Sequence, residues 1–130
     1  MGHNDISAET LTSYLEKVIE LNRYIPILVE GRNDEASLKE LGFEGKIYKI
    51  NIGLPMSELA ELIAKEDKEI ILLTDWDDMG EGLFLKLLPL LRANGVKVIT
   101  RVRRDLEALS KKYAKDVESL PKALEAMSRG

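Results

Sequence analysis

The sequence predicts an α/β fold in which a central four-stranded parallel sheet lies between two layers of helices, with a further helix at the N-terminus. Short apolar runs of strand length alternate along the chain with longer stretches of helical period. The most continuous apolar run, residues 69–74, has the pattern of a strand covered on both faces, which is typical of parallel sheets. The chain has 130 residues, 45% of them hydrophobic, which suffices for one core but not for two.

The first half of the chain contains two predicted strands. Apolar residues recur at helical spacing after Ser7 or Asp5, either of which could cap a helix. Pro26 opens a short, β-branched run that stops at Glu30, the pattern of a buried strand. Gly42 suits the position after the next helix, where a left-handed backbone is common. The predicted elements are a helix over 11–21, a strand over 27–29, a helix over 34–41 and a strand over 46–50.

The second half repeats this alternation. Pro55 and Ser57 introduce a helix, and a long apolar helix ends at Asn94 and Gly95 after a mild interruption by Pro89. The charged remainder of the chain is predicted to be mostly helical, with Leu106, Leu109 and Tyr113 on one side. The predicted elements are a helix to residue 65, strands over 69–74 and 96–100, a helix over 79–94 between them, and a last short helix over 121–127.

The organisation predicted is one domain with additions at both ends. Residues 1–23 form a helical lead-in, 24–105 the α/β domain, and 106–130 a helical extension of the same domain. No stretch approaches the ~20 apolar residues that a membrane-spanning helix needs, and the start has no signal-peptide pattern, so we expect a cytoplasmic protein without a membrane partner. His3, the single histidine, lies in a predicted loose start and is a poor candidate for a ligand or base.

Acidic residues follow the first and third predicted strands. Glu30 and Asp34 come after the first, and Asp75, Asp77 and Asp78 come after the third. Ligands of open parallel sheets bind outside the carboxyl ends of the strands, where the strand order reverses. If these two strands are neighbours at that point, Glu30 faces the aspartates. The alternative is that Asp34 and Asp78 only cap the helices that follow.

A cluster of carboxylates points to a divalent cation. Three carboxylates held together without one would repel each other and raise some of their pKa values. Because the chain has no Cys and no usable His, any ligands must be oxygen atoms, which favours Mg²⁺, with Mn²⁺ or Ca²⁺ as alternatives. Gly31, Gly80 and Gly82 flank the acids and either leave room for a phosphate group or serve only the turns.

Two sequence motifs carry a resemblance to a known family. Residues 27–34, ILVEGRND, are similar to its hydrophobic-Glu-Gly-x-x-Asp motif, and residues 71–82, ILLTDWDDMGEG, are similar to its hydrophobic-Asp-x-Asp-x-x-Gly motif. Together they resemble the Toprim domain, a Rossmann-like catalytic module of primases, topoisomerases and small nucleases. The resemblance covers residues 24–105, and the short chain looks like the small stand-alone Toprim proteins of archaea.

The resemblance implies Mg²⁺-dependent action on nucleic acid phosphodiesters, as a nuclease-like enzyme or as the phosphotransfer subunit of an assembly. It implies Mg²⁺, with Mn²⁺ possible, as the cofactor and DNA or RNA as the partner. It also implies a role for each matching residue. Glu30 would be a general acid/base and a metal ligand, Asp75 and Asp77 would bind the metal, and Gly31, Asp34 and Gly80 would support them.

The basic residues near the motifs leave two interpretations open. Asp78 stands where family members often have Lys or Arg, and Arg32 stands where a Lys is frequent. Arg101, Arg103 and Arg104 follow the fourth strand, where they either guide a nucleic-acid backbone toward the metal or form a solvated helix start with salt bridges. Trp76, between two aspartates, either stacks on a base or packs in the core, and core packing is favoured.

Two other classes of function remain open from the sequence. The short chain, its formal charge of −4 and Asp78 suit a non-catalytic metal- and nucleic-acid-binding module that works with a protein partner. Acidic strand ends also suit a receiver-like domain phosphorylated on aspartate, but the chain lacks an obvious Lys after a fifth strand. Since these 130 residues leave no room for a topoisomerase strand gate or a primase zinc module, we expect neither complete enzyme.

Overall fold

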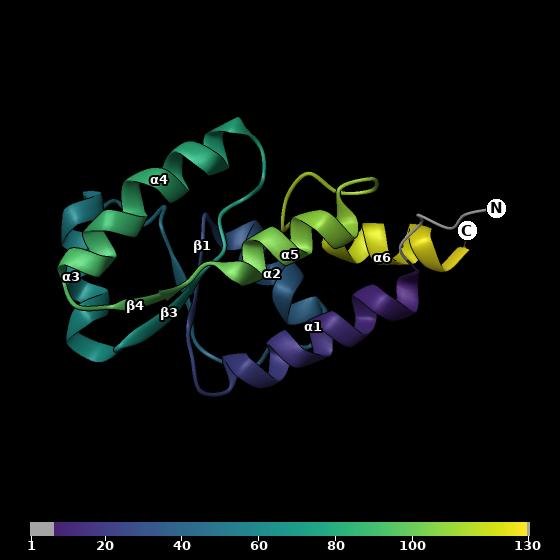
Figure 1. The fold of residues 1–130 in the computed structure, drawn as a ribbon, viewed down its shortest axis with the longest axis horizontal. Helices are drawn as coiled ribbons and strands as arrows, with labels where there is room; N and C mark the ends of the chain where they lie inside the picture. The colour runs from purple at the N-terminus through teal and green to yellow at the C-terminus, as the bar shows by residue number, and fades with distance from the viewer. Residues whose placement is uncertain (1–6, 130) are drawn as a thin grey trace.

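The structure is a computed structural model that describes residues 7–129, so His3 lies outside the described residues. Four parallel strands form one sheet in the order β2-β1-β3-β4, and six helices surround it (Figure 1). The predicted fold class is confirmed. The strands are β1 (Ile27–Val29), β2 (Ile47–Lys49), β3 (Glu69–Leu72) and β4 (Lys97–Ile99). The helices are α1 (Ala8–Asn22), α2 (Arg32–Glu40), α3 (Met56–Glu66), α4 (Asp78–Ala93), α5 (Arg101–Ser110) and α6 (Leu120–Arg129).

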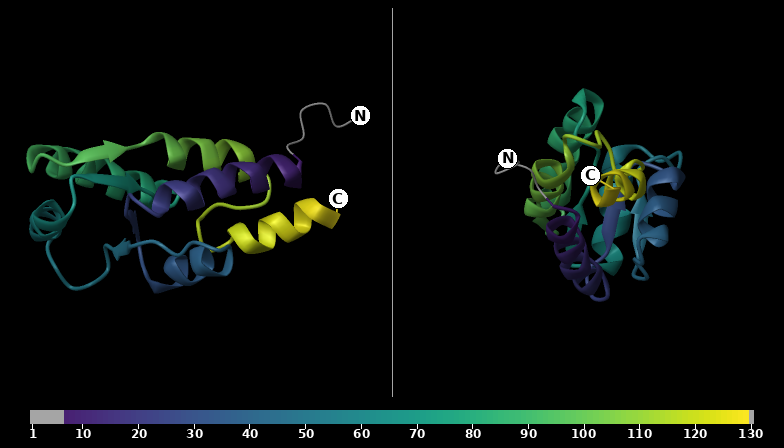
Figure 2. Two further views of the ribbon diagram at one scale, coloured as in Figure 1. Left: turned by 90° about the horizontal axis from the view of Figure 1, so that it is seen from below. Right: turned by 90° about the vertical axis from the view of Figure 1, so that its right-hand side faces the viewer.

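The sheet separates two apolar cores. Side chains that alternate along the strands point to opposite faces, so Ile27 and Val29 pack on one side and Leu28 on the other. Helices α1, α2, α5 and α6 cover the first face, and α3 and α4 cover the second. Figure 2 shows the molecule from two further sides, with the start of α1 and the end of α6 at the same end. No helix within residues 7–129 is both long and apolar enough to span a membrane.

The helix boundaries follow local chemistry. The Ser7 side chain accepts a hydrogen bond from the Thr10 amide and caps α1, as predicted. Gly42 after α2 and Gly95 after α4 have φ angles of 107° and 81°, the left-handed region that glycine tolerates best. The C-terminal part is mostly helical, as predicted, and α6 contains the last helix expected over 121–127. One detail differs: α5 ends at Ser110, so Tyr113 lies in the non-helical connection over residues 111–119 and not on a helix.

The strand order places the reversal point between β1 and β3. From β1 the chain moves outward to β2 on one side, whereas β3 pairs with the other side of β1 and β4 follows beyond it. The condition stated for the sequence, that the first and third strands are neighbours, is therefore met. Their carboxyl ends, which carry the two acidic motifs, meet at the place where sheets of this kind bind ligands.

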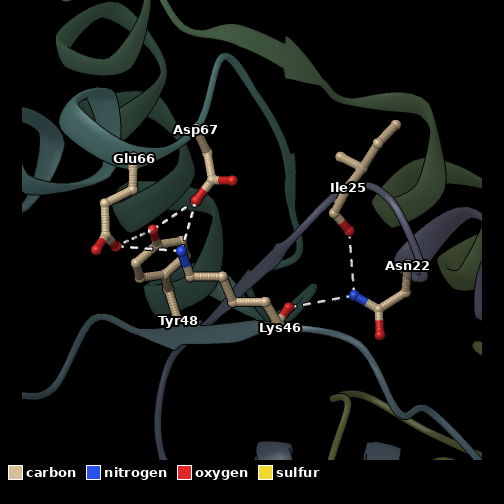
Figure 3. A network of polar contacts seen from close by, with 6 residues as sticks. All are labelled: Asn22, Ile25, Lys46, Tyr48, Glu66 and Asp67. Atoms are coloured by element: carbon tan, nitrogen blue, oxygen red, sulfur yellow. Dashed lines mark hydrogen bonds and ion pairs between the residues drawn. The ribbon is translucent and has the colours of Figure 1, made fainter.

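The opposite, amino edge of the sheet is fixed by polar side chains (Figure 3). Asn22, almost fully buried, donates to the backbone oxygens of Ile25 and Lys46, both at 3.1 Å. The Tyr48 hydroxyl donates to Asp67 at 2.6 Å, and the Lys46 ammonium lies 2.8 Å from the same carboxylate. These contacts join the end of α1 to the starts of β2 and β3 and lie away from the acidic motifs.

Candidate metal and acid–base site

The first acidic motif and the second touch each other directly. The Glu30 carboxylate, just after β1, accepts a hydrogen bond of 2.8 Å from the backbone amide of Asp75, which follows β3. The Asp75 carboxylate in turn accepts a bond of 2.9 Å from the amide of Val117. The structure thus brings Glu30 and Asp75 together as a pair, each held by a backbone N–H.

Proximity and burial change the acidity of this pair. Burial raises the pKa of Glu30 to about 7; the Asp75 amide opposes the rise, and the negative charge of Asp75 adds to it. Burial also raises the pKa of Asp75, with a contribution from the charge of Asp116. A carboxyl whose pKa lies near neutrality can both give and take a proton, which is the property a general acid/base needs.

Asp34 supports the first motif from within. Its carboxylate accepts a hydrogen bond of 3.0 Å from the Gly31 amide at the start of α2, so it orders the loop that carries Glu30. It is 7% exposed, and burial, with the nearby Asp75 charge, raises its pKa to about 6. Asp34 therefore both caps α2 and lines the same cleft as Glu30 and Asp75.

Gly80 has a steric reason to be glycine. A Cβ atom at this position would lie 1.9 Å from the carbonyl oxygen of Asp75, so any side chain would push the second motif apart. The Gly80 carbonyl also accepts a hydrogen bond of 2.8 Å from the Thr74 hydroxyl. Gly31 differs, because a Cβ there would meet nothing within 4 Å and its φ of −158° suits any residue.

The pair opens into a cleft of about 680 Å³, a size suited to a small ligand or part of a larger one. Glu30, Asp34, Asp75 and Glu118 give it an acidic floor and rim, and Arg32 is the one basic residue among those that line it. The lining also includes apolar residues, namely Ile50 and Leu54 from the loop after β2 and Met79 and Leu83 from α4.

Asp77 does not complete a three-carboxylate site. Its side chain accepts a bond of 2.7 Å from the Gly80 amide and caps α4, although its charge contributes to the raised pKa of Asp75. Within residues 7–129 no group of three or more His, Cys, Asp or Glu side chains could hold a metal ion. Glu30 and Asp75 nevertheless fit Mg²⁺, which commonly takes one or two carboxylates and completes its sphere with water and phosphate oxygens.

Arg103 forms an ion pair, as one of its two interpretations expected, but it is buried and not solvated. It is only 8% exposed, and its guanidinium donates to the backbone oxygens of Thr74 and Asp75, at 3.1 and 2.9 Å. It also pairs with Glu81 at 2.9 Å and lies 4.9 Å from the centre of the Phe84 ring. Arg103 thus braces the second motif from behind and is not presented to a nucleic acid.

The other three predicted basic contacts are exposed but separated. Arg32 lines the cleft, whereas Arg101 lines a small depression between α1 and α5 with Tyr14 and Lys17. Arg104 lies 3.7 Å from Asp105, and its side chain is 78% exposed. Among the described residues that were predicted to meet phosphate, only Arg32 is therefore at the site.

The turn between α5 and α6 contributes residues that sequence reasoning missed. Glu118 lines the cleft, Asp116 influences Asp75 electrostatically, and the Val117 amide bonds to Asp75. Trp76 packs toward this turn, donating from its ring nitrogen to the Ala114 oxygen at 2.9 Å, which agrees with the core role favoured for it. In the sequence, only the acidic residues Asp116 and Glu118 could have indicated that this turn contributes to the site. Nothing in their spacing linked them to the two motifs.

The fold and the site together define a class of protein: a three-layer α/β/α domain with an acidic pair at the reversal point of its parallel sheet. Comparison with family models agrees, because residues 25–102 match the Toprim domain. The chain belongs to the Toprim domain family. The match coincides with the region over which the motifs predicted it.

Relatives come from archaea. A UPF0292 protein of Pyrococcus horikoshii is 47% identical over 94 residues, which cover 72% of this chain and 70% of the relative. A UPF0292 protein of Methanosarcina barkeri is 36% identical over 120 residues, covering 89% and 83% of the two chains. A solved structure of a small protein from Aquifex aeolicus superposes with a TM-score of 0.74 at 24% identity, over 85% of this chain and 97% of that one, which supports the fold.

Proposed function

We propose that this protein carries out divalent-cation-dependent phosphodiester chemistry on nucleic acid, with Glu30 as the proton-transfer group and Asp75 as the principal metal ligand. The observation that carries the proposal is the direct contact of the two motifs, in which the Asp75 amide holds a Glu30 carboxyl whose pKa is raised to about 7. Membership of the Toprim family supports a metal-binding domain with a nucleic-acid-related role.

We assign different roles to Glu30 and Asp75 because their surroundings differ. Glu30 lies in the cleft, partly buried, and can take a proton from an attacking oxygen or give one to a departing oxygen. Asp75 supplies negative charge beside it, and Gly31 leaves open space at the cleft wall. A bound Mg²⁺ or Mn²⁺ would neutralise charge on the phosphoryl oxygens. We assign Asp77 to capping α4 and shaping the field at Asp75, not to direct coordination.

The test begins with metal binding, measured by calorimetry. We expect Mn²⁺ and Mg²⁺ to bind the wild type, and Asp75→Asn to abolish binding because it removes the ligand charge. Asp78→Asn is the matched control, since this exposed acid lies on the same turn but does not line the cleft. Equal binding by wild type and Asp75→Asn would contradict the assignment.

Turnover is tested separately on single- and double-stranded DNA and RNA with Mg²⁺ or Mn²⁺. Cleavage or phosphoryl transfer should disappear in Glu30→Gln, which keeps the shape of the side chain but cannot carry the proton. Persistence of full turnover in this variant would refute the role of Glu30.

A second candidate function is a non-catalytic binding module that needs a protein partner. The observation that favours it is the acidic cleft, which has Arg32 as the one basic residue in its lining, because Arg103 is buried behind the site. A substrate backbone would then need positive charge from another protein. Metal binding without turnover on every substrate would support this second function over the first.

A further inference from the structure

The turn that joins α5 to α6 holds the site from outside the matched Toprim residues, which end at 102. The amide of Val117 donates to Oδ1 of Asp75 at 2.9 Å. Val117 itself is fully buried, and its side chain belongs to the apolar core on the α1 face of the sheet. The donor is therefore placed by core packing and not by a loose loop.

Two further bonds tie the same turn to the two motif regions. The ring nitrogen of Trp76, next to Asp75, donates to the carbonyl of Ala114 at 2.9 Å. The hydroxyl of Ser37, in the helix that begins at the first motif, donates to the carbonyl of Glu118 at 2.9 Å. Residues 114–118 thus bridge α2, which follows β1, and the loop between β3 and α4.

From these contacts we infer that residues 114–118 position the Asp75 carboxylate for the cation, with the Val117 amide as the positioning group. An N–H that holds one carboxylate oxygen restricts rotation of the group and so fixes the direction in which the other oxygen is presented. Loss of a hydrogen-bond partner of a metal ligand typically weakens metal binding about 10- to 100-fold. The inference rests on the proposed function, because it assumes that Asp75 binds the metal.

The test compares two ways of removing this support. Val117→Pro deletes the N–H and keeps an apolar side chain. The double variant Ser37→Ala/Trp76→Phe keeps the Val117 donor but removes both other anchors, so it serves if the proline variant fails to fold. Mn²⁺ affinity is measured by calorimetry, and hydrogen exchange of the peptide over residues 111–119 reports whether the turn has opened.

Ser110→Ala is the matched control. Its hydroxyl is also buried and donates to the Leu106 carbonyl within α5 at 2.6 Å. The Ser110 carbonyl accepts from the amides of Tyr113 and Ala114, and the alanine variant keeps that carbonyl. Ser37→Thr retains the hydroxyl, so this variant should bind Mn²⁺ with wild-type affinity.

We expect the Mn²⁺ dissociation constant to rise about tenfold or more in both disruptive variants, and to stay within about twofold in the control. Faster exchange over residues 111–119 should accompany the loss. An unchanged dissociation constant in folded Val117→Pro, or in the double variant with an opened turn, would overturn the inference and leave the proposed function standing. A wild type that binds no Mn²⁺ would instead refute the proposed function, and the inference with it.

Discussion

Replacement of Arg103 by Met should lower the free energy of unfolding by about 3 kcal/mol. Arg101 and Arg104 lie beside it in the sequence, but of the three only Arg103 is buried. The buried guanidinium bonds to the carbonyls of Thr74 and Asp75 and to the Glu81 carboxylate. Met fills most of the volume of the aliphatic stem but leaves the carbonyls without their donor.

The magnitude follows from these contacts taken one by one. A hydrogen bond from a charged donor contributes about 1.5–3 kcal/mol, and the buried Thr74 carbonyl cannot recover its loss from water as the Asp75 carbonyl can in part. The Glu81 side chain is 54% exposed, so its ion pair adds at most about 1 kcal/mol. The contact with Phe84 adds about 0.5–1 kcal/mol. A total near 3 kcal/mol is the conservative sum.

The assay is urea denaturation followed by circular dichroism, with thermal melting as a check. A loss of about 3 kcal/mol corresponds to a fall in melting temperature of roughly 10 °C for a domain of this size. Arg104→Met is the control, since its side chain is 78% exposed and its change should stay within about 0.5 kcal/mol. If Arg103→Met costs less than about 1 kcal/mol, or no more than Arg104→Met, the bracing role is wrong.

Two further predictions concern the motifs themselves. Gly80→Ala should lose about 2 kcal/mol or more in urea denaturation because its Cβ would overlap the Asp75 carbonyl, whereas Gly31→Ala, with open space around it, should change stability little; equal effects would contradict the steric argument. Without divalent cations, the melting temperature should be higher at pH 5 than at pH 8. Glu30 and Asp34 have folded pKa values of about 7 and 6, so the folded state binds more protons than the unfolded state between about pH 4 and 7, and stability falls as pH rises through that window. Glu30→Gln should make the melting temperature depend less on pH. A wild-type melting temperature that rises from pH 5 to pH 8 would refute the raised pKa values.

The sequence contained enough to predict the meeting of the two motifs. Strand-length apolar runs ended at Glu30 and Asp75, and only the pairing of β1 with β3 was needed to bring them to one point. That pairing was conditional in the sequence, because strand order depends on contacts between residues more than forty positions apart. The structure supplies it, and the Glu30 to Asp75 hydrogen bond is its direct consequence.

The burial of Arg103 between two exposed arginines follows from the geometry of α5. Val102, Arg103, Leu106 and Ser110 are the buried residues of α5 and share one face, while Arg101 and Arg104 are exposed. Consecutive helical residues are about 100° apart, so neighbouring arginines can differ completely in environment. Charge composition grouped the three arginines, whereas helical phase would have separated Arg103 from the others.

The position of Arg103 also bears on how a polyanion could reach this site. Its guanidinium bonds to the Asp75 carbonyl and pairs with Glu81, and it does not line the cleft. It therefore does not offset the negative charge of Glu30 and Asp75 in the cleft. A phosphodiester approaching that cleft would be repelled until a cation or a basic partner offset those charges. If the protein binds nucleic acid without a basic partner, metal binding should therefore come first. The dependence of nucleic-acid affinity on Mg²⁺ concentration then becomes the quantity that distinguishes a metal-recruited substrate from one delivered by a partner.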